Sequence, residues 1–93
     1  MRTIERTGQF KRDYKREKKG QHRLVLDAVL VEIIGKLASD EPLDPRHRDH
    51  ALSGDWHYHR DCHIQPDLVL INRTPDKQTL QLVRLGSHAE LGW

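Results

Sequence analysis

The feature that most constrains this fold is an apolar stripe in an otherwise polar chain. Between residues 23 and 38, large aliphatic side chains recur every three or four positions: Leu26, Val29, Leu30, Ile33, Ile34 and Leu37. This spacing places them on one face of a helix, whose natural position is against the core. Because only 35% of the 93 residues are hydrophobic, we predict a single domain, residues 1–93, with one modest core.

Shorter elements are predicted before this helix. Alternating side chains at residues 2–6 indicate a strand. Phe10 and Tyr14 lie four residues apart in a charged stretch and indicate a helix over residues 8–19. Gly20 is expected to end that helix in the left-handed conformation.

The C-terminal half predicts strands. Pro42 and Pro45 exclude a continuous helix and leave residues 39–52 as a long connection. Strands are expected at residues 56–60, 62–64, 68–72 and 79–85, with a bend or bulge at Gln65-Pro66 and a hairpin turn at residues 74–77. The order strand, two helices, three consecutive strands (β-α-α-β-β-β) predicts an α+β fold. In that fold two N-terminal helices pack on one face of a mostly antiparallel, four-stranded sheet.

Composition excludes several classes of protein. No stretch approaches the roughly 20 apolar residues of a membrane span, and the basic N-terminus lacks the apolar region of a signal peptide. The single cysteine, Cys62, cannot form an internal disulfide, which agrees with a reducing compartment. We therefore expect a cytoplasmic protein without a membrane partner.

Charge is distributed unevenly along the chain. Residues 1–23 hold nine Lys or Arg against three acids, a local balance of +6, so the remaining seventy residues carry −4 within the total of +2. Such a block is typical of proteins that bind a polyanion such as nucleic acid, although a solvated helix face gives the same pattern. The side chains expected to contact RNA are Lys11, Arg12, Lys15, Arg16, Lys18 and Lys19.

Six of the seven histidines fall in the C-terminal half of the chain. Histidine gives or takes a proton near neutral pH, and Arg60, Arg84, Asp61 and Asp67 stand among these histidines as candidate phosphate ligands and orienting carboxylates. The combination indicates acid–base chemistry on an anion. For His22, His47, His57 and His59 no partner is evident, so we expect half-exposed polar side chains.

Three separated motifs resemble the YafQ family of bacterial toxins in the RelE/ParE superfamily. They are His50-Ala-Leu-Ser-Gly-Asp-Trp56, Tyr58-His-Arg60-Asp61-Cys-His63-Ile-Gln-Pro66-Asp67-Leu-Val-Leu-Ile71 and Leu82-Val-Arg84-Leu-Gly86-Ser87-His88. The resemblance extends from residue 8 to the C-terminus. It implies a small toxin that cuts messenger RNA in the decoding site of the 70S ribosome without a metal or other cofactor. It also implies a cognate antitoxin that wraps and silences the toxin in a hetero-oligomer.

Carried over by position, the resemblance implies functional roles for His50, His63, Asp67 and His88, with Arg84 as a phosphate contact. The chain departs from the family pattern at three places. Leu68 replaces a frequent tryptophan, Asn72 replaces a usual tyrosine, and Leu91-Gly92-Trp93 replaces a more common Leu-Phe ending. Loss of an aromatic at Leu68 would remove one surface on which a base could stack, which leaves codon preference open.

The chemistry of these residues also fits RNA cleavage without a metal. That reaction needs a base for the 2′-hydroxyl, a donor or cation for the phosphate and an acid for the leaving 5′-oxygen. We assign Asp67 or His50 as base, His88 as acid, and His63 and Arg84 to the phosphate. Positions four apart in one strand share a face, so His63 and Asp67 are expected to be neighbours. Arg60 and Asp61 are expected either to pair with each other or to support the reacting residues from behind.

Two other classes of function remain open at this stage. A toxin of the same fold could bind a protein target such as DNA gyrase, since a fold alone does not define a function; the histidine set argues against it. A metal-binding module could use His57, His59 and His63, the first two on one face of a strand. The usual Cys/His spacing of structural zinc sites is absent, so we rank this class last.

Overall fold

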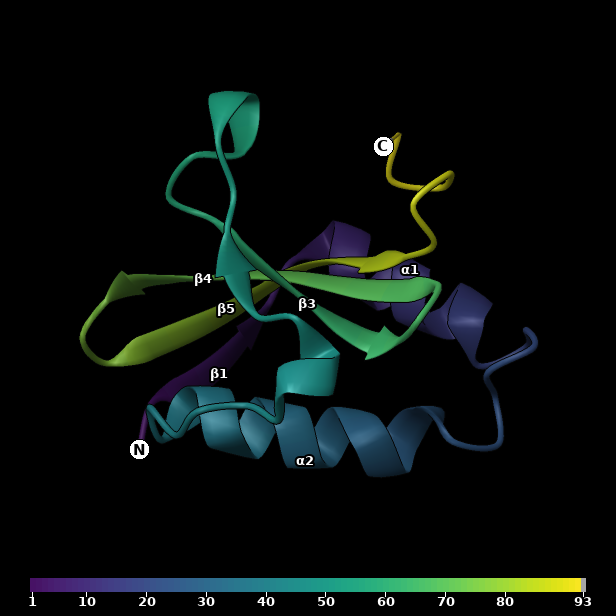
Figure 1. Cartoon of the computed structure of the whole chain (residues 1–93), viewed down its shortest axis with the longest axis horizontal. Helices are drawn as coiled ribbons and strands as arrows, with labels where there is room; N and C mark the ends of the chain where they lie inside the picture. The colour runs from purple at the N-terminus through teal and green to yellow at the C-terminus, as the bar shows by residue number, and fades with distance from the viewer. Residues whose placement is uncertain (93) are drawn as a thin grey trace.

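Figure 1 shows a computed structural model that describes residues 1–92, in which two helices pack on a five-stranded sheet. Trp93, part of the ending that departs from the family pattern, lies outside the described residues. The elements in chain order are β1 (Thr3–Arg6), α1 (Gly8–Glu17), α2 (Leu26–Ala38), the 3₁₀ turn η1 (Pro45–His47), β2 (His50–Ala51), the 3₁₀ turn η2 (Gly54–Trp56), β3 (Arg60–Gln65), β4 (Leu68–Asp76) and β5 (Thr79–Gly86). The predicted α+β class is confirmed.

The sheet order is β1-β5-β4-β3-β2. Neighbouring strands are antiparallel except for β1 and β5, which are parallel and pair Thr3 with Thr79. The predicted count of four strands is wrong by one. The connection after α2 contains β2, two residues long, and so short a strand has no alternation that a sequence pattern can reveal.

The two faces of the sheet carry separate apolar clusters. The main core lies between the sheet and the helices, where Phe10 of α1 and Leu30 and Ile33 of α2 meet the inward side chains of β3, β4 and β5. Figure 1 shows α2 running along this face, with the η2 segment and the C-terminal segment on the opposite side. A smaller cluster on that opposite face joins Val69 and Ile71 to Leu91, with Leu52, Trp56 and Val83 packed around them.

Both helices are shorter than predicted. Helix α1 begins after Thr7, whose hydroxyl caps it by accepting from the Phe10 N–H at 3.0 Å, and ends at Glu17. Gly20 does not take the left-handed conformation, because residues 18–25 continue in turns up to Leu26, where α2 begins. Neither helix is long and apolar enough to cross a membrane.

The strand predicted over residues 56–60 is also wrong. Gly54 has a φ of +66° and starts η2, and Tyr58 has a φ of +71°, so the chain turns twice before β3 begins at Arg60. Strand β4 runs to Asp76, which moves the predicted hairpin turn to Lys77-Gln78. The predicted irregularity near Gln65 is confirmed by a register shift between His63 and Gln65.

Candidate active site

The candidate site lies on the face of the sheet opposite the helices. In β3, Cys62 and Ile64 are buried in the main core, so the alternation of the strand turns Asp61 and His63 to the other face. His63 pairs across the sheet with Val69, which in turn pairs with Gly86 of β5. The end of β5 therefore leads the chain past His63 into the segment that carries His88.

His63 and His88 are in direct contact. Their ring centroids are 5.3 Å apart in an edge-to-face arrangement. His88 Nδ1 lies 3.5 Å from Asp67 Oδ1. Asp67 is in the turn between β3 and β4 rather than in the strand of His63, so the expectation that both share one strand is wrong. The turn at Pro66 nevertheless brings these three predicted residues to one end of the sheet.

His50 joins the group through a buried carboxylate. Its Nδ1 lies 3.0 Å from Asp61 Oδ1, while its hydrogen bond is directed to the Arg48 carbonyl oxygen at 2.6 Å. Asp61 is only 2% exposed, and this Oδ1 atom makes no hydrogen bond within the described chain. Burial raises the pKa of Asp61, and the nearby His50, His63 and His88 oppose that rise.

The environment of His63 differs from that of the exposed His50. Burial lowers the pKa of His63, Asp61 opposes that shift, and positive charge on His88, Arg48 and His50 adds to it. His63 is therefore neutral at neutral pH, with one nitrogen able to accept a proton and the other able to donate a hydrogen bond. Arg48, with a φ of +47°, is a cation near His63 that sequence reasoning missed, although it lies in the motif His47-Arg48-Asp49-His50.

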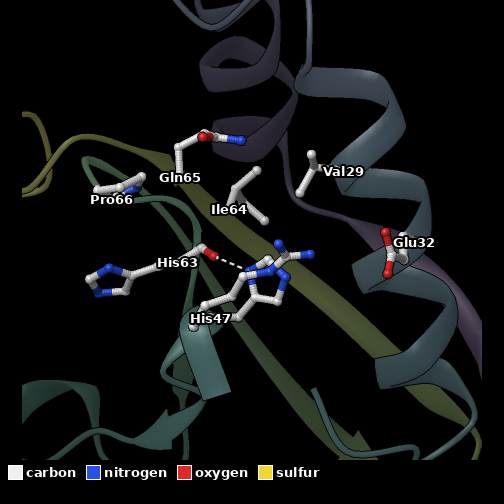
Figure 2. A pocket seen from close by; sticks show the side chains of 8 residues that line it. Val29, Glu32, His47, His63, Ile64, Gln65 and Pro66 are labelled. Carbon is white, nitrogen blue, oxygen red and sulfur yellow. Dashed lines mark hydrogen bonds between the residues drawn. The ribbon is translucent and has the colours of Figure 1, made fainter. Parts of the chain in front are cut away.

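His47 was expected to be a half-exposed polar side chain, and that expectation is wrong. It is 8% exposed, and its Nδ1 lies 2.7 Å from the backbone oxygen of His63. A carbonyl oxygen only accepts, so Nδ1 donates. Figure 2 shows this bond, with the His63 ring pointing away from His47. The bond lies beside a hollow of about 220 Å³ that is lined by residues of α2, η1, β3 and the turn after β3. The His47 ring thus supports β3 from behind the site.

Arg84 is held at the other edge of the sheet. Its Nε lies 2.7 Å from Oδ2 of Asp13, a carboxylate of α1 whose side chain is fully buried. Asp13 Oδ2 also accepts the Leu85 N–H at 3.0 Å. The Arg84 side chain is 23% exposed in this pair. The geometry thus gives Arg84 a structural bond with α1, and its expected contact with the phosphate remains a prediction.

Other predicted residues take different places. Arg60 pairs with Asp49 at 3.1 Å, so the predicted alternative of an Arg60–Asp61 pair is wrong. His57 and His59 bond to nearby backbone oxygens in the turns before β3, and the shared strand face assumed for them does not exist. Within residues 1–92, no group of three or more His, Cys, Asp or Glu side chains has an arrangement that could hold a metal ion.

The six basic side chains of the predicted RNA-binding block are all exposed. Lys18 pairs with Asp27 at 2.7 Å, and Arg16 bonds to several groups of the fold. Leu68 is fully buried in the main core, so it offers no surface on which a base could stack. Fold and site together define a small α+β protein with histidines and carboxylates gathered on the open face of its sheet.

Comparison with known proteins identifies the family. The family described as "Bacterial toxin of type II toxin-antitoxin system, YafQ" matches residues 2–92, and the chain therefore belongs to it. The mRNA interferase toxin YafQ of Escherichia coli K12 is 34% identical over 91 residues, which cover 98% of this chain and 96% of that protein.

Solved structures agree with this family. A copper-bound mutant toxin from Helicobacter pylori has a TM-score of 0.83 and 41% identity over 98% of this chain and 99% of that chain. In the E. coli DinJ-YafQ toxin-antitoxin complex, the matching chain has a TM-score of 0.83 and 35% identity over 99% of this chain and 98% of its own length.

Proposed function

We propose that this protein is a toxin that acts as an mRNA interferase, cutting codons in the ribosomal A site by general acid–base catalysis. The observation that carries the proposal is the meeting of His50, His63 and His88 with Asp61 and Asp67 on one open sheet face. The name of the E. coli relative, mRNA interferase toxin, supports the same activity. A binder of a protein target would need no such cluster of proton carriers.

The geometry supports a division of roles among these residues. His88 serves as the acid for the leaving 5′-oxygen, and Asp67, whose Oδ1 lies 3.5 Å from His88 Nδ1, orients its ring. Asp67 or His50 takes the proton of the 2′-hydroxyl. His63, neutral because burial lowers its pKa, donates a ring N–H to the phosphate. Arg84 contributes positive charge, and Arg48 is a further cation close to His63.

The ribosome and the absence of a metal requirement are parts of this proposal. The site is an open sheet face, so the decoding site is needed to hold the 2′-hydroxyl in line with the phosphate. Acid and base groups on the protein supply the proton transfers that a metal-bound water supplies elsewhere. Because one relative binds copper, metal dependence has to be tested directly.

An antitoxin is the expected partner, and the cytoplasm is the expected place of action. The E. coli relative was solved in a toxin-antitoxin complex with DinJ. We propose that this chain likewise forms a hetero-oligomer with a cognate antitoxin. Its substrate, mRNA on 70S ribosomes, is cytoplasmic.

The test is cleavage of a defined mRNA on purified ribosomes. We expect cleavage that persists in EDTA, within the range that ribosomes tolerate, and products with a 2′,3′-cyclic or 3′-phosphate end, because the 2′-oxygen attacks. Free RNA should be cut poorly. The His88→Ala protein, added at equal concentration, serves as the control for contaminating nucleases.

Two results would contradict the proposal. A 3′-hydroxyl product would show that water rather than the 2′-oxygen attacks. Activity that is lost in EDTA and restored by added copper or zinc, with intact ribosomes, would replace the acid–base mechanism by a metal-dependent one.

A further inference from the structure

The segment that carries His88 is a turn closed by reciprocal hydrogen bonds. The Ser87 N–H donates to Glu90 Oε1 at 2.9 Å, and the Glu90 N–H donates to Ser87 Oγ at 3.1 Å. This is the capping-box arrangement, in which the first and fourth residues satisfy each other's backbone donors. His88 lies between them, so the direction of its side chain depends on this turn.

Arg16 of α1 ties the same turn to the body of the protein. Its Nε lies 2.9 Å from Glu90 Oε2, and its Nη2 donates to the Leu85 carbonyl oxygen at 2.9 Å. The remaining nitrogen, Nη1, lies 3.1 Å from the buried carboxylate of Asp13, and Nε also lies 2.9 Å from Glu17. The guanidinium therefore joins α1, the end of β5 and the turn after it.

Gly86 leaves room for this guanidinium. A Cβ atom at Gly86 would lie 2.9 Å from Arg16 Nη2 and 3.3 Å from the Cβ of Glu90. Any side chain at this position would therefore push the guanidinium or the turn away. Gly86 thus leaves room for the ion pair of Arg16 and Glu90, which we call the clamp. Ser87 caps the turn, and His88 is the ring that the turn presents.

We propose that Arg16 and Glu90 are positioning residues that hold the His88 ring against His63. The catalytic consequence rests on the proposed ribonuclease function, whereas the geometry does not. The hydrogen bonds from Ser87 lower the pKa of Glu90, and the nearby Arg16 acts in the same direction, so its carboxylate stays charged at neutral pH. In this reading Arg16 acts within the fold rather than as a contact to ribosomal RNA.

The experiment compares Glu90→Ala, Glu90→Gln and Arg16→Met. Glu90→Ala removes both the acceptor for the Ser87 N–H and the negative charge that pairs with Arg16, whereas Glu90→Gln keeps the acceptor and removes only that negative charge. Glu5→Gln is the matched control, because it neutralises an exposed glutamate of β1 that accepts a hydrogen bond from Gln81. Nuclear Overhauser contacts between the His63 and His88 rings are measured in the purified free protein, and kcat and KM on ribosomes programmed with mRNA.

We expect Glu90→Ala and Arg16→Met to lose the ring contacts and to lower kcat by about tenfold to a hundredfold, because small displacements of reacting groups have effects of that size. KM should stay unchanged in both variants. The kcat of Glu90→Gln should lie between that of Glu90→Ala and that of the unsubstituted protein, and Glu5→Gln should match the unsubstituted protein. If Arg16→Met fails to fold, the two Glu90 variants decide.

Different results would overturn different parts of the inference. Ring contacts of full strength in both Glu90→Ala and Arg16→Met would refute the clamp, whatever the cleavage rates. A higher KM at unchanged kcat in Arg16→Met would instead assign Arg16 to RNA binding. If the unsubstituted protein cut no RNA, the proposed function would fail, and the ring contacts alone would still decide the clamp.

Discussion

Asp61 shows how one side chain can serve a site at the expense of stability. It is buried, one of its oxygens makes no hydrogen bond within residues 1–92, and three histidines lie close enough to influence its pKa. Burial disfavours the charged form of a carboxylate more than these neighbours favour it. A group kept under such a penalty is characteristic of functional sites.

Replacing Asp61 by asparagine should therefore stabilise the fold at neutral pH. The pKa of Asp61 is raised in the folded state, so its ionisation costs stability as the pH rises through the folded pKa, and the neutral amide avoids that cost. We expect a gain on the order of 1 kcal/mol at pH 7, shrinking as the pH falls below the unfolded pKa. Urea unfolding at pH 7 and at a pH below the unfolded pKa measures this gain in stability, with the exposed Asp55→Asn as control. A loss of stability of Asp61→Asn at pH 7 would contradict the argument.

The four residues assigned to the reaction should act as a unit. Alanine at His50, His63, Asp67 or His88 should each abolish growth inhibition, with losses that do not add in combined variants, because these residues are proposed to act together in one reaction. The readout is growth after induced expression without antitoxin. His57→Ala, a histidine outside the cluster, is the control. Full toxicity of His88→Ala at equal expression would remove the acid assignment.

At the scale of elements, the α1 region bonds to the part of the β5 edge that β1 does not cover. Strand β1 pairs with β5 only from Thr79 to Leu82. Beyond that point the backbone of β5 bonds to side chains of the α1 region. Thr7 Oγ1 donates to the Val83 oxygen, Asp13 Oδ2 accepts from the Leu85 N–H, and Arg16 donates to the Leu85 oxygen. The helix therefore satisfies backbone groups that would otherwise be unpaired.

Asp13 bonds to both Arg84 and the Leu85 N–H at this edge, so replacing it should lower the stability of the fold. Burial alone would raise the pKa of Asp13, but hydrogen bonds from Arg84, the Leu85 N–H and Gln9, together with the charge on Arg84, hold it below the ordinary value. Its contribution to stability is present above the unfolded pKa and is lost as the pH falls through the folded one. We expect Asp13→Asn to cost about 2 to 4 kcal/mol at pH 7, because Arg84 loses its counter-charge.

Chemical unfolding from pH 7 down to pH 2 tests this prediction. The acid-dependent loss of stability should be clearly smaller in Asp13→Asn than in the unsubstituted protein. Asp27→Asn is the matched control, since Asp27 also pairs with a cation, Lys18, but at the surface. An Asp13→Asn protein as stable as the control variant at pH 7 would show that the pair with Arg84 contributes little.

Across the whole molecule, charge and chemistry occupy neighbouring regions. Helix α1 carries four exposed basic residues, Lys11, Arg12, Lys15 and Arg16, and it packs beside the end of β5, from which the chain continues to His88 (Figure 1). Positive charge beside the proposed acid–base site suits a polyanion whose backbone extends beyond the bond that would be cut. Such contacts supply affinity that falls with salt and carry little sequence information.

Charge reversal on α1 should weaken ribosome binding without moving the cut. We expect Lys11→Glu with Lys15→Glu to lower ribosome affinity by about tenfold or more at low salt, with the same codons cut. Lys36→Glu with Lys77→Glu changes the net charge equally, away from α1, and is the control. The measurements are ribosome pelleting at several salt concentrations and mapping of cleavage ends. A shifted codon preference at unchanged affinity would place these lysines in the active site.

Local patterns in the sequence determined the α+β class, the core face of α2 and the irregularity near Gln65. Periodicity reports which side chains share a face, and Pro and Gly report where the chain must turn. The same patterns failed at residues 56–60, where Gly54 and Tyr58 adopt positive φ and replace the expected strand with turns. Short-range alternation is not evidence of a strand when the backbone between its members is left-handed.

The histidines and carboxylates of the site were identified from composition and motif, but their arrangement was not. Only the tertiary structure decided that Asp61 lies beside His50, that His47 supports His63, and that Arg84 and Arg16 converge on Asp13. Asp13 and Arg84 are about seventy positions apart. Their pairing depends on how α1 packs against β5, and no periodicity within one element encodes the distance between two.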